Sequence, residues 1–356
     1  MKNLYCNKPF REITTTVDGK YLICPWSMVE YGSIFDVNLD NYIQSEYLNN
    51  IKKDMMENIL SNDLKKLCEK CLRLEEKGLK SNRDDQIYNG KYFEIYNVNH
   101  IGNRCNLKCI GCGPERSSQY GPLIDVDKNL DYDLQDLYEL KEINILGGEP
   151  FLSPLTKKIL LNNLKWGVKV TVVTNGLFFP KYLYDLKFKE NLNIFISYDG
   201  IGELDDYLRV GSNFEKKLKN TKLFFENFNT NIMLTINFIN YFFIDSIKQF
   251  FLEKFNYEIK TANRMMIPNI FDPINLPKHL KNNFSDRFKN EEPDNDVLLS
   301  GISYFKTKDL LEGEKKFLKF MPQFIDDYNR VDINQFEKQN MRDFSANVPD
   351  LEIFNI

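Results

Sequence analysis

Three closely spaced cysteines are the residues of this chain best suited to chemistry. Cys105, Cys109 and Cys112 form a C-x3-C-x2-C pattern shortly after an apolar segment. Thiolates at this spacing can bind three corners of a cubane iron–sulfur cluster from one loop, and they leave the fourth iron open to a small chelating molecule. Two alternatives stay open at this point: a zinc site with a distant fourth ligand, or three unrelated buried cysteines.

Four further cysteines precede this loop. Cys6, Cys24, Cys68 and Cys71 complete the seven cysteines of the chain, and none follows Cys112. Four thiolates can saturate a second cubane cluster, which would then relay electrons or brace the residues around it. A structural zinc site is the alternative, because the C-x2-C spacing is also half of a zinc ribbon.

Composition excludes several other classes of protein. The 356 residues have a formal net charge of −4, so we expect no basic surface and no nucleic-acid partner. Two histidines are too few for a histidine-rich metal centre. The N-terminus lacks an apolar export segment, and no run is long enough to cross a membrane. We therefore expect a cytoplasmic protein without a membrane partner, in which the cysteines bind metal rather than form disulfides.

Strands and helices are expected to alternate from residue 92 onward. Apolar runs predict strands at 93–98, 142–146, 168–173, 193–197, 231–238 and 259–267. Helices are expected between them at 134–140, from Pro154 to a stop at Gly167, at 213–227 and at 245–254. This alternation predicts an α/β fold with a parallel sheet, in which ligands bind where the carboxyl ends of the strands meet the loops.

Three segments are expected along the chain. Residues 1–91 would form a cysteine-rich module, 92–275 the α/β barrel and 276–356 a helical extension. The polar stretch 75–90 is the best candidate linker between the first two. Runs of mixed charge, such as FEKKLKNTK at 214–222, are expected to be solvated helix faces.

The cysteine loop resembles the signature of a known enzyme family. CNLKCIGC after the first strand is similar to the motif of radical S-adenosylmethionine (radical SAM) enzymes, and Gly147, Gly148 and Glu149 resemble the GGE motif that ends their second strand. The resemblance implies a partial (β/α)6 TIM-like barrel, an open [4Fe–4S] cluster on the three catalytic cysteines, and S-adenosylmethionine (SAM) as cofactor. The two glycines would let backbone carbonyls reach the methionyl ammonium group of SAM, with help from Glu149.

Softer matches to the family follow the later strands. The resemblance implies that Thr174 contacts the cofactor or shapes the mouth of the barrel, and that Ser197 and Asp199 hold the ribose hydroxyls. Arg209 would pair with the SAM carboxylate. Asn237 would face the ribose or the adenine, and Ile267 would contact the adenine. For each of them an ordinary polar turn or core residue is the alternative.

The first four cysteines resemble part of the pattern of the SPASM and shorter twitch auxiliary-cluster domains. Those domains normally follow the barrel, whereas here the module precedes it. Residues 14–24 predict a hairpin that turns at Asp18 and Gly19 and presents Cys24 at a strand end. The resemblance implies a second [4Fe–4S] cluster on Cys6, Cys24, Cys68 and Cys71.

These matches imply reductive cleavage of SAM to a 5′-deoxyadenosyl radical that abstracts hydrogen from a substrate. Two clusters would use all seven cysteines, so no thiol is left to donate hydrogen or carry a methyl group. We therefore expect an oxidative outcome, a cross-link or dehydrogenation of a peptide or protein side chain, with the auxiliary cluster as electron acceptor. An electron donor such as flavodoxin or ferredoxin would be a partner.

Two other functions stay open. The same radical chemistry could act on a carbohydrate or another small metabolite. A protein of a different class, an iron–sulfur electron carrier or a zinc-stabilised interaction module, is also compatible with the cysteine count, although neither needs a vacant iron or a GGE motif.

Overall fold

The computed structural model describes residues 3–264 except positions 28, 77–80, 82, 91–92, 100, 127–139, 165–167, 238–239 and 260. The helix expected at 134–140 falls almost entirely in one of these gaps. The end of the sixth predicted strand with Ile267, and the extension at 276–356, also lie outside the described residues.

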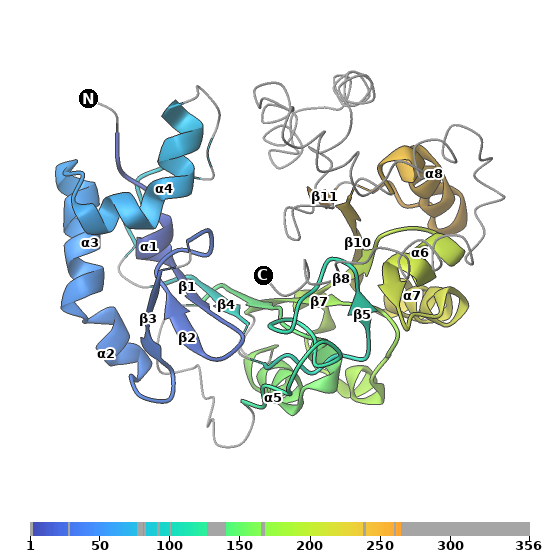
Figure 1. Cartoon of the computed structure of the whole chain (residues 1–356). Coiled ribbons are helices and arrows are strands. Elements are labelled where there is room, and N and C mark those ends of the chain that lie inside the picture. Colours follow the sequence, from blue (N-terminus) through green and yellow to red (C-terminus); the bar gives the residue numbers. More distant parts are fainter. Residues whose placement is uncertain are drawn as a thin grey trace.

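A single sheet of nine strands organises the described chain, in the order β11-β10-β8-β7-β6-β4-β1-β2-β3 (Figure 1). Neighbouring strands from β4 to β11 pair in parallel, which confirms the predicted α/β fold with its partial, TIM-like barrel. These six strands are β4 (Ile95–Val98), β6 (Glu142–Ile145), β7 (Lys169–Thr174), β8 (Leu192–Tyr198), β10 (Asn229–Ile236) and β11 (Thr261–Arg264).

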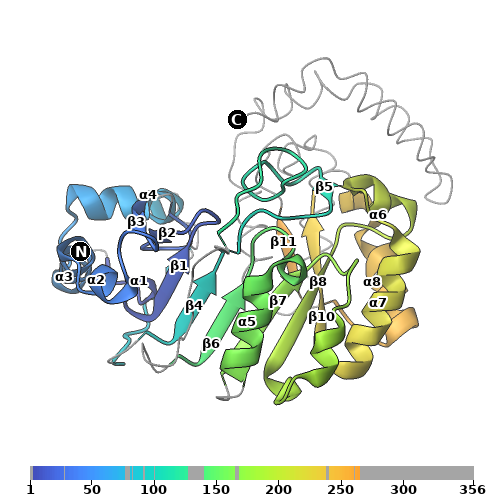
Figure 2. The same ribbon diagram turned by 90° about the horizontal axis from the view of Figure 1, so that it is seen from below.

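Helices cover the outer side of this curved sheet (Figure 2). They are α5 (Pro154–Asn163), α7 (Phe214–Asn227) and α8 (Ile244–Phe255), joined by the short 3-10 helices η2 (Pro150–Leu152), η4 (Lys181–Asp185), η5 (Lys189–Asn191) and η6 (Asn240–Phe243). Alternate strand residues point toward them and join one hydrophobic core, among them Ile143, Val170, Ile194 and Ile232, all 0% exposed. The residues between these point to the opposite face, and many of them are polar.

The N-terminal strands extend the same sheet. β1 (Glu12–Thr15) pairs in parallel with β4, and β2 (Lys20–Leu22) and β3 (Glu30–Ser33) follow in antiparallel order. The hairpin predicted between residues 14 and 24 is confirmed, and Gly19 takes a φ of +86° in its turn. The hairpin that ends near Cys24 and the barrel therefore belong to one continuous sheet.

Four helices pack beside β1, β2 and β3 (Figure 1). They are α1 (Lys8–Arg11), α2 (Leu39–Ile43), α3 (Glu46–Glu57) and α4 (Asn62–Glu76). The polar stretch 75–90 returns along the start of the chain, where the N–H of Asn7 donates to the carbonyl of Asp84 at 2.8 Å and Arg83 pairs with Glu75 at 2.7 Å. Its described part is therefore held against the N-terminus rather than free.

A small two-stranded sheet lies at the carboxyl ends of the large one. β5 (Lys108–Cys109) pairs antiparallel with β9 (Arg209–Val210), which follows α6 (Glu203–Leu208). Through this pairing the cysteine loop is attached to the chain beyond β8. No helix among the described residues has both the length and the apolar character needed to cross a membrane.

Continuity of the sheet predicts that the N-terminal strands unfold together with the barrel. Ile13 of β1 is 0% exposed, and its replacement by alanine should cost about 2–5 kcal/mol of unfolding free energy. In urea titrations we expect one shifted transition, with hydrogen exchange in β4 and β6 accelerated as well. Two separate transitions, with exchange in β6 unchanged, would contradict this expectation.

Candidate active site

The three-cysteine loop brings its sulfurs together on an apolar floor. Cys109 is buried with Leu107 and Leu177, and Cys105 and Cys112 pack against this cluster. The pKa of Cys109 is lowered because the Cys112 thiol hydrogen-bonds to it, and nearby positive charges act in the same direction. Grouped, mutually interacting thiols in a dry environment are a donor set that fits an iron–sulfur cluster.

Residues on both sides of the loop hold it in shape. The buried hydroxyl of Ser117 donates to the carbonyl of Leu107 at 2.6 Å, and the Tyr120 hydroxyl donates to the carbonyl of Cys109 at 2.7 Å. The side-chain amide of Asn103 donates to the carbonyls of Pro114 and Pro122 at 2.7 and 2.9 Å. The sequence did not single out these residues, because their partners are backbone carbonyls, which no side-chain pattern marks.

The GGE motif packs the end of β6 closely against the start of the cysteine loop. The N–H of Gly148 donates to the carbonyl of Gly102 at 3.1 Å, and that of Glu149 donates to the carbonyl of Arg104 at 2.7 Å. A Cβ on Gly148 would come within 2.7 Å of the carbonyl carbon of Asn103. Glycine at this position is therefore needed for the close approach of the two backbones.

Glu149 is fixed from two strands. Its carboxylate, in a residue 1% exposed, accepts the Thr174 hydroxyl at 2.6 Å, the N–H of Phe151 at 3.2 Å and the N–H of Asn175 at 2.7 Å. Burial raises the pKa of Glu149, and these hydrogen bonds oppose the rise. Oε1 takes two of the donors and Oε2 takes one, so Oε2 keeps a lone pair for a further donor.

Arg209 lies beside the cysteines on the other side. Its backbone pairs with that of Cys109 across β5 and β9, and its Nη1 donates to Oδ2 of Asp199 at 3.0 Å. The two side chains are 12% and 4% exposed. Nε of Arg209 and Oδ1 of Asp199 are buried and make no hydrogen bond with any described residue. A buried guanidinium with an unused donor fits a carboxylate ligand.

A second buried ion pair continues from Asp199. Nζ of Lys217 donates to Oδ2 of Asp205 at 2.7 Å, with both side chains 0% exposed, and Oδ1 of Asp205 accepts the N–H of Asp199 at 3.0 Å. The same Nζ lies 3.6 Å from the ring centroid of Tyr198. The expectation of a solvated face at 214–222 is therefore wrong for Lys217. The periodicity of the helix could not show that Asp205 of α6 packs against it.

The remaining predicted residues lie around this centre. Ser197 is half-buried on the face of β8 opposite the helices. Asn237 is buried after β10, where its N–H donates to Oδ1 of Asn240 at 2.8 Å, and Asn240 in turn donates to the carbonyl of Asp199 at 2.8 Å. The structure thus links Asn237 to Asp199 through a residue that the sequence did not indicate.

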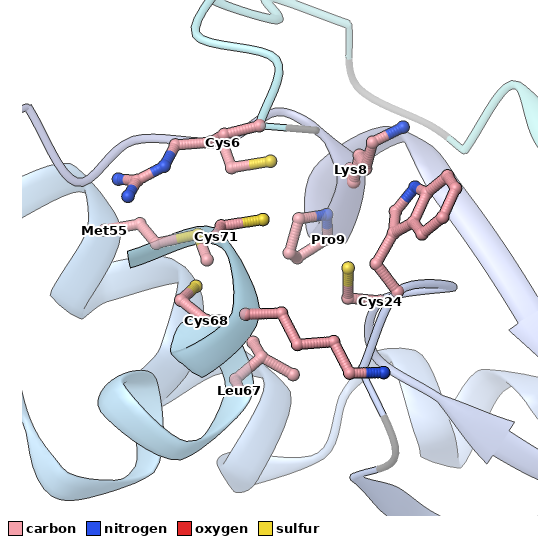
Figure 3. A pocket seen from close by; sticks show the side chains of 11 residues that line it. Cys6, Lys8, Pro9, Cys24, Met55, Leu67, Cys68 and Cys71 are labelled. Carbon is pink, nitrogen blue, oxygen red and sulfur yellow. The ribbon is translucent and has the colours of Figure 1, made fainter. Parts of the chain in front are cut away.

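The other four cysteines line one pocket beside α4 (Figure 3). Cys6 comes from the N-terminal segment, Cys24 from the end of the hairpin, and Cys68 and Cys71 from one face of α4. The pocket contains a cavity of about 20 Å3 and is partly open to solvent. Burial raises the pKa of Cys24 and of Cys68 to about 12, so the thiols release protons when they bind metal.

The central part of the chain is similar to a known protein family. Residues 99–251 match the model of the Radical SAM superfamily, and no curated protein matches the sequence. Among solved structures, the chain is 19% identical to anSMEcpe with bound AdoMet, over 48% of this chain and 51% of that one, with a TM-score of 0.39.

SuiB from Streptococcus suis is a second structural neighbour. Its complex with S-adenosylmethionine is 17% identical over 71% of this chain and 60% of SuiB, with a TM-score of 0.37. Its complex with the precursor peptide SuiA is 16% identical over 72% and 61%, with a TM-score of 0.38. The chain thus spans between half and three fifths of these proteins. The matched segment contains both the cysteine loop and the GGE motif, so the central part of this chain contains a radical SAM domain.

Proposed function

We propose that this protein is an enzyme that cleaves SAM reductively and uses the resulting radical to remove hydrogen from a substrate. The observation that carries the proposal is the meeting of the three-cysteine loop, Glu149 and Arg209 at the carboxyl ends of the parallel strands. When bound, the reduced [4Fe–4S] cluster supplies the electron that breaks the C5′–S bond of SAM. The residues of the chain bind and orient the reactants.

Two opposite charges would orient the methionyl part of SAM. Oε2 of Glu149 retains acceptor capacity for the ammonium group, and Nε of Arg209 can donate to the carboxylate. Both residues are attached to the cysteine loop, Glu149 through Arg104 and Arg209 through Cys109. They would therefore hold the two chelating groups next to the iron that no cysteine binds.

The remaining cofactor contacts are proposed from position. Thr174 would act through Glu149, because its hydroxyl donates to Oε1 and so orients the carboxylate. Ser197 and Asp199 would face the ribose, and Asn237 the ribose or adenine, because all three follow or end neighbouring strands at the same edge of the sheet. The adenine contact proposed for Ile267 lies outside the described residues.

The four-cysteine pocket is proposed to bind a saturated auxiliary [4Fe–4S] cluster. A structural zinc site on the same four cysteines is the alternative. Lys8 and Arg83 line the pocket and would offset the negative charge of the cluster.

An oxidative reaction on a peptide or protein side chain is the proposed outcome. The two clusters together would use all seven cysteines, so no thiol is left to return hydrogen to the substrate. An electron leaving the substrate would then pass to the auxiliary cluster. The proposed partners are this substrate and a low-potential donor such as flavodoxin or ferredoxin, and the proposed location is the cytoplasm, where thiols stay reduced.

A row of neutral polar side chains supports a substrate rich in amide or hydroxyl groups. Thr14, Asn97, Asn144, Thr171 and Asn193 stand in register across five strands. They lie on the sheet face opposite the helices, and the amide of Asn97 donates to Thr14 while that of Asn144 donates to Asn97, each at 3.0 Å. Amides both donate and accept, as peptide groups require. Sugar hydroxyls have the same needs, so a carbohydrate is the second candidate.

The two cysteine groups predict separable defects. Replacing Cys105 by alanine should abolish 5′-deoxyadenosine formation from SAM and dithionite under anaerobic conditions, since the vacant iron site is lost. Replacing Cys68 and Cys71 by alanine should leave this cleavage intact but stop oxidation of the substrate. Each variant should lose about four of eight irons.

Other outcomes of these assays would contradict the proposal. A wild-type protein with about eight irons that forms no 5′-deoxyadenosine would be an electron carrier. Bound zinc without iron in the four-cysteine pocket would indicate a structural module, and full substrate turnover by the Cys68→Ala/Cys71→Ala variant would exclude the auxiliary electron acceptor.

The brace behind the cysteine loop predicts a defect in cluster retention. Ser117→Ala leaves the buried carbonyl of Leu107 without its donor, at a cost of about 1–3 kcal/mol. We expect faster loss of iron to a chelator, measured by the absorbance of the iron–chelator complex. Arg116→Ala, a change at an exposed neighbour, is the control, and equal iron loss from both variants would contradict the bracing role.

A further inference from the structure

Four buried charges lie behind the three-cysteine loop. Arg209 follows α6 in β9, Asp199 follows β8, Asp205 is on α6 and Lys217 is on α7. Asp205 and Lys217 are 0% exposed, a rare condition for charged side chains unless they are paired. A buried pair of this kind is weak evidence for stability by itself, because desolvation offsets much of the attraction. Its place in the site is therefore informative.

The four groups form one connected chain of contacts. Lys217 donates to one oxygen of Asp205, and the other oxygen accepts the backbone N–H of Asp199. The carboxylate of Asp199 then accepts Nη1 of Arg209, which leaves Nε unused. Asp205 thus fixes the residue that holds Arg209, although it makes no hydrogen bond to Arg209 itself within the described contacts.

Charge in this group is balanced, with two cations facing two anions. Burial lowers the pKa of Lys217 to about 8, so the lysine is still mainly protonated near pH 7. Without its charge, two carboxylates would face a single guanidinium. Asp205 would then compete with any anionic ligand for Arg209, because the positive charge of Arg209 already acts on Asp205 and Asp199 through a dry interior.

We propose that Asp205 and Lys217 are a positioning pair that keeps Arg209 available to a carboxylate ligand. Lys217 neutralises Asp205, Asp205 fixes the backbone of Asp199, and Asp199 orients the guanidinium with Nε free. The inference rests on the proposed function, in which the ligand is the methionyl carboxylate of SAM. It makes Lys217 necessary for cofactor affinity although this lysine does not touch the cofactor.

The test measures SAM binding to the iron-loaded protein without reductant, by anaerobic calorimetry near pH 7. Lys217→Met should raise the Kd for SAM roughly tenfold, as expected when one partner of a buried pair is truncated. The double variant Asp205→Asn/Lys217→Met removes both charges and keeps an oxygen for the N–H of Asp199. It should return to within about threefold of the wild type. Lys216→Met, at an exposed neighbour, is the control and should bind like the wild type.

Recovery in the double variant separates a charge effect from a merely structural one. A double variant that binds as weakly as Lys217→Met would overturn the positioning role, and so would wild-type affinity in Lys217→Met. If Lys217→Met fails to fold or to hold iron, Lys217→Gln takes its place as the single variant, and the same comparison with a double variant that also carries Asp205→Asn decides. A wild-type protein that binds no SAM would instead overturn the proposed function.

Discussion

Attachment of the cysteine loop to the carboxyl ends of the strands is the constraint on which the rest of the site depends. Two of the backbone contacts that provide it are the hydrogen bond from the N–H of Glu149 to the carbonyl of Arg104 and the pairing of Cys109 with Arg209. Each contact also delivers a charged side chain to the loop. The same geometry therefore positions the thiols and the two groups proposed to bind the ends of an amino acid, without a further element to align them.

Burying these charges imposes its own requirements. Glu149 stays in a dry site because three donors, from the end of β7 and from the segments after β6 and β7, bind its oxygens. Arg209 stays there because Asp199, and behind it Asp205 and Lys217, balance its charge. Groups held so tightly lose little further freedom when a ligand arrives, which favours binding by a preorganised site.

The continuous sheet relates the two cysteine groups. β1 pairs with β4, the strand that leads into the three-cysteine loop, and the hairpin that begins with β1 ends at Cys24. The four-cysteine pocket is thus built on the same rigid layer as the barrel. A shared sheet of this kind would suit the proposed transfer of an electron from a substrate in the barrel to an auxiliary cluster, because it relates the two sites through paired strands.

Much of the chemistry could be predicted from sequence, because it depends on residues close together in the chain. The spacing of Cys105, Cys109 and Cys112, the GGE motif and the alternation of strands and helices are local patterns, and the structure places them as a parallel sheet with a loop at its carboxyl edge. Ser117, Asn240, Asp205 and Lys217 could not be found this way. Their partners lie ten or more residues away in the chain. A lysine in a polar helix has the same local pattern whether it contacts water or a buried acid. Sequence by itself determined which groups could bind metal and cofactor, whereas the tertiary structure decided which charges are buried together, because desolvation depends on what the fold brings into contact.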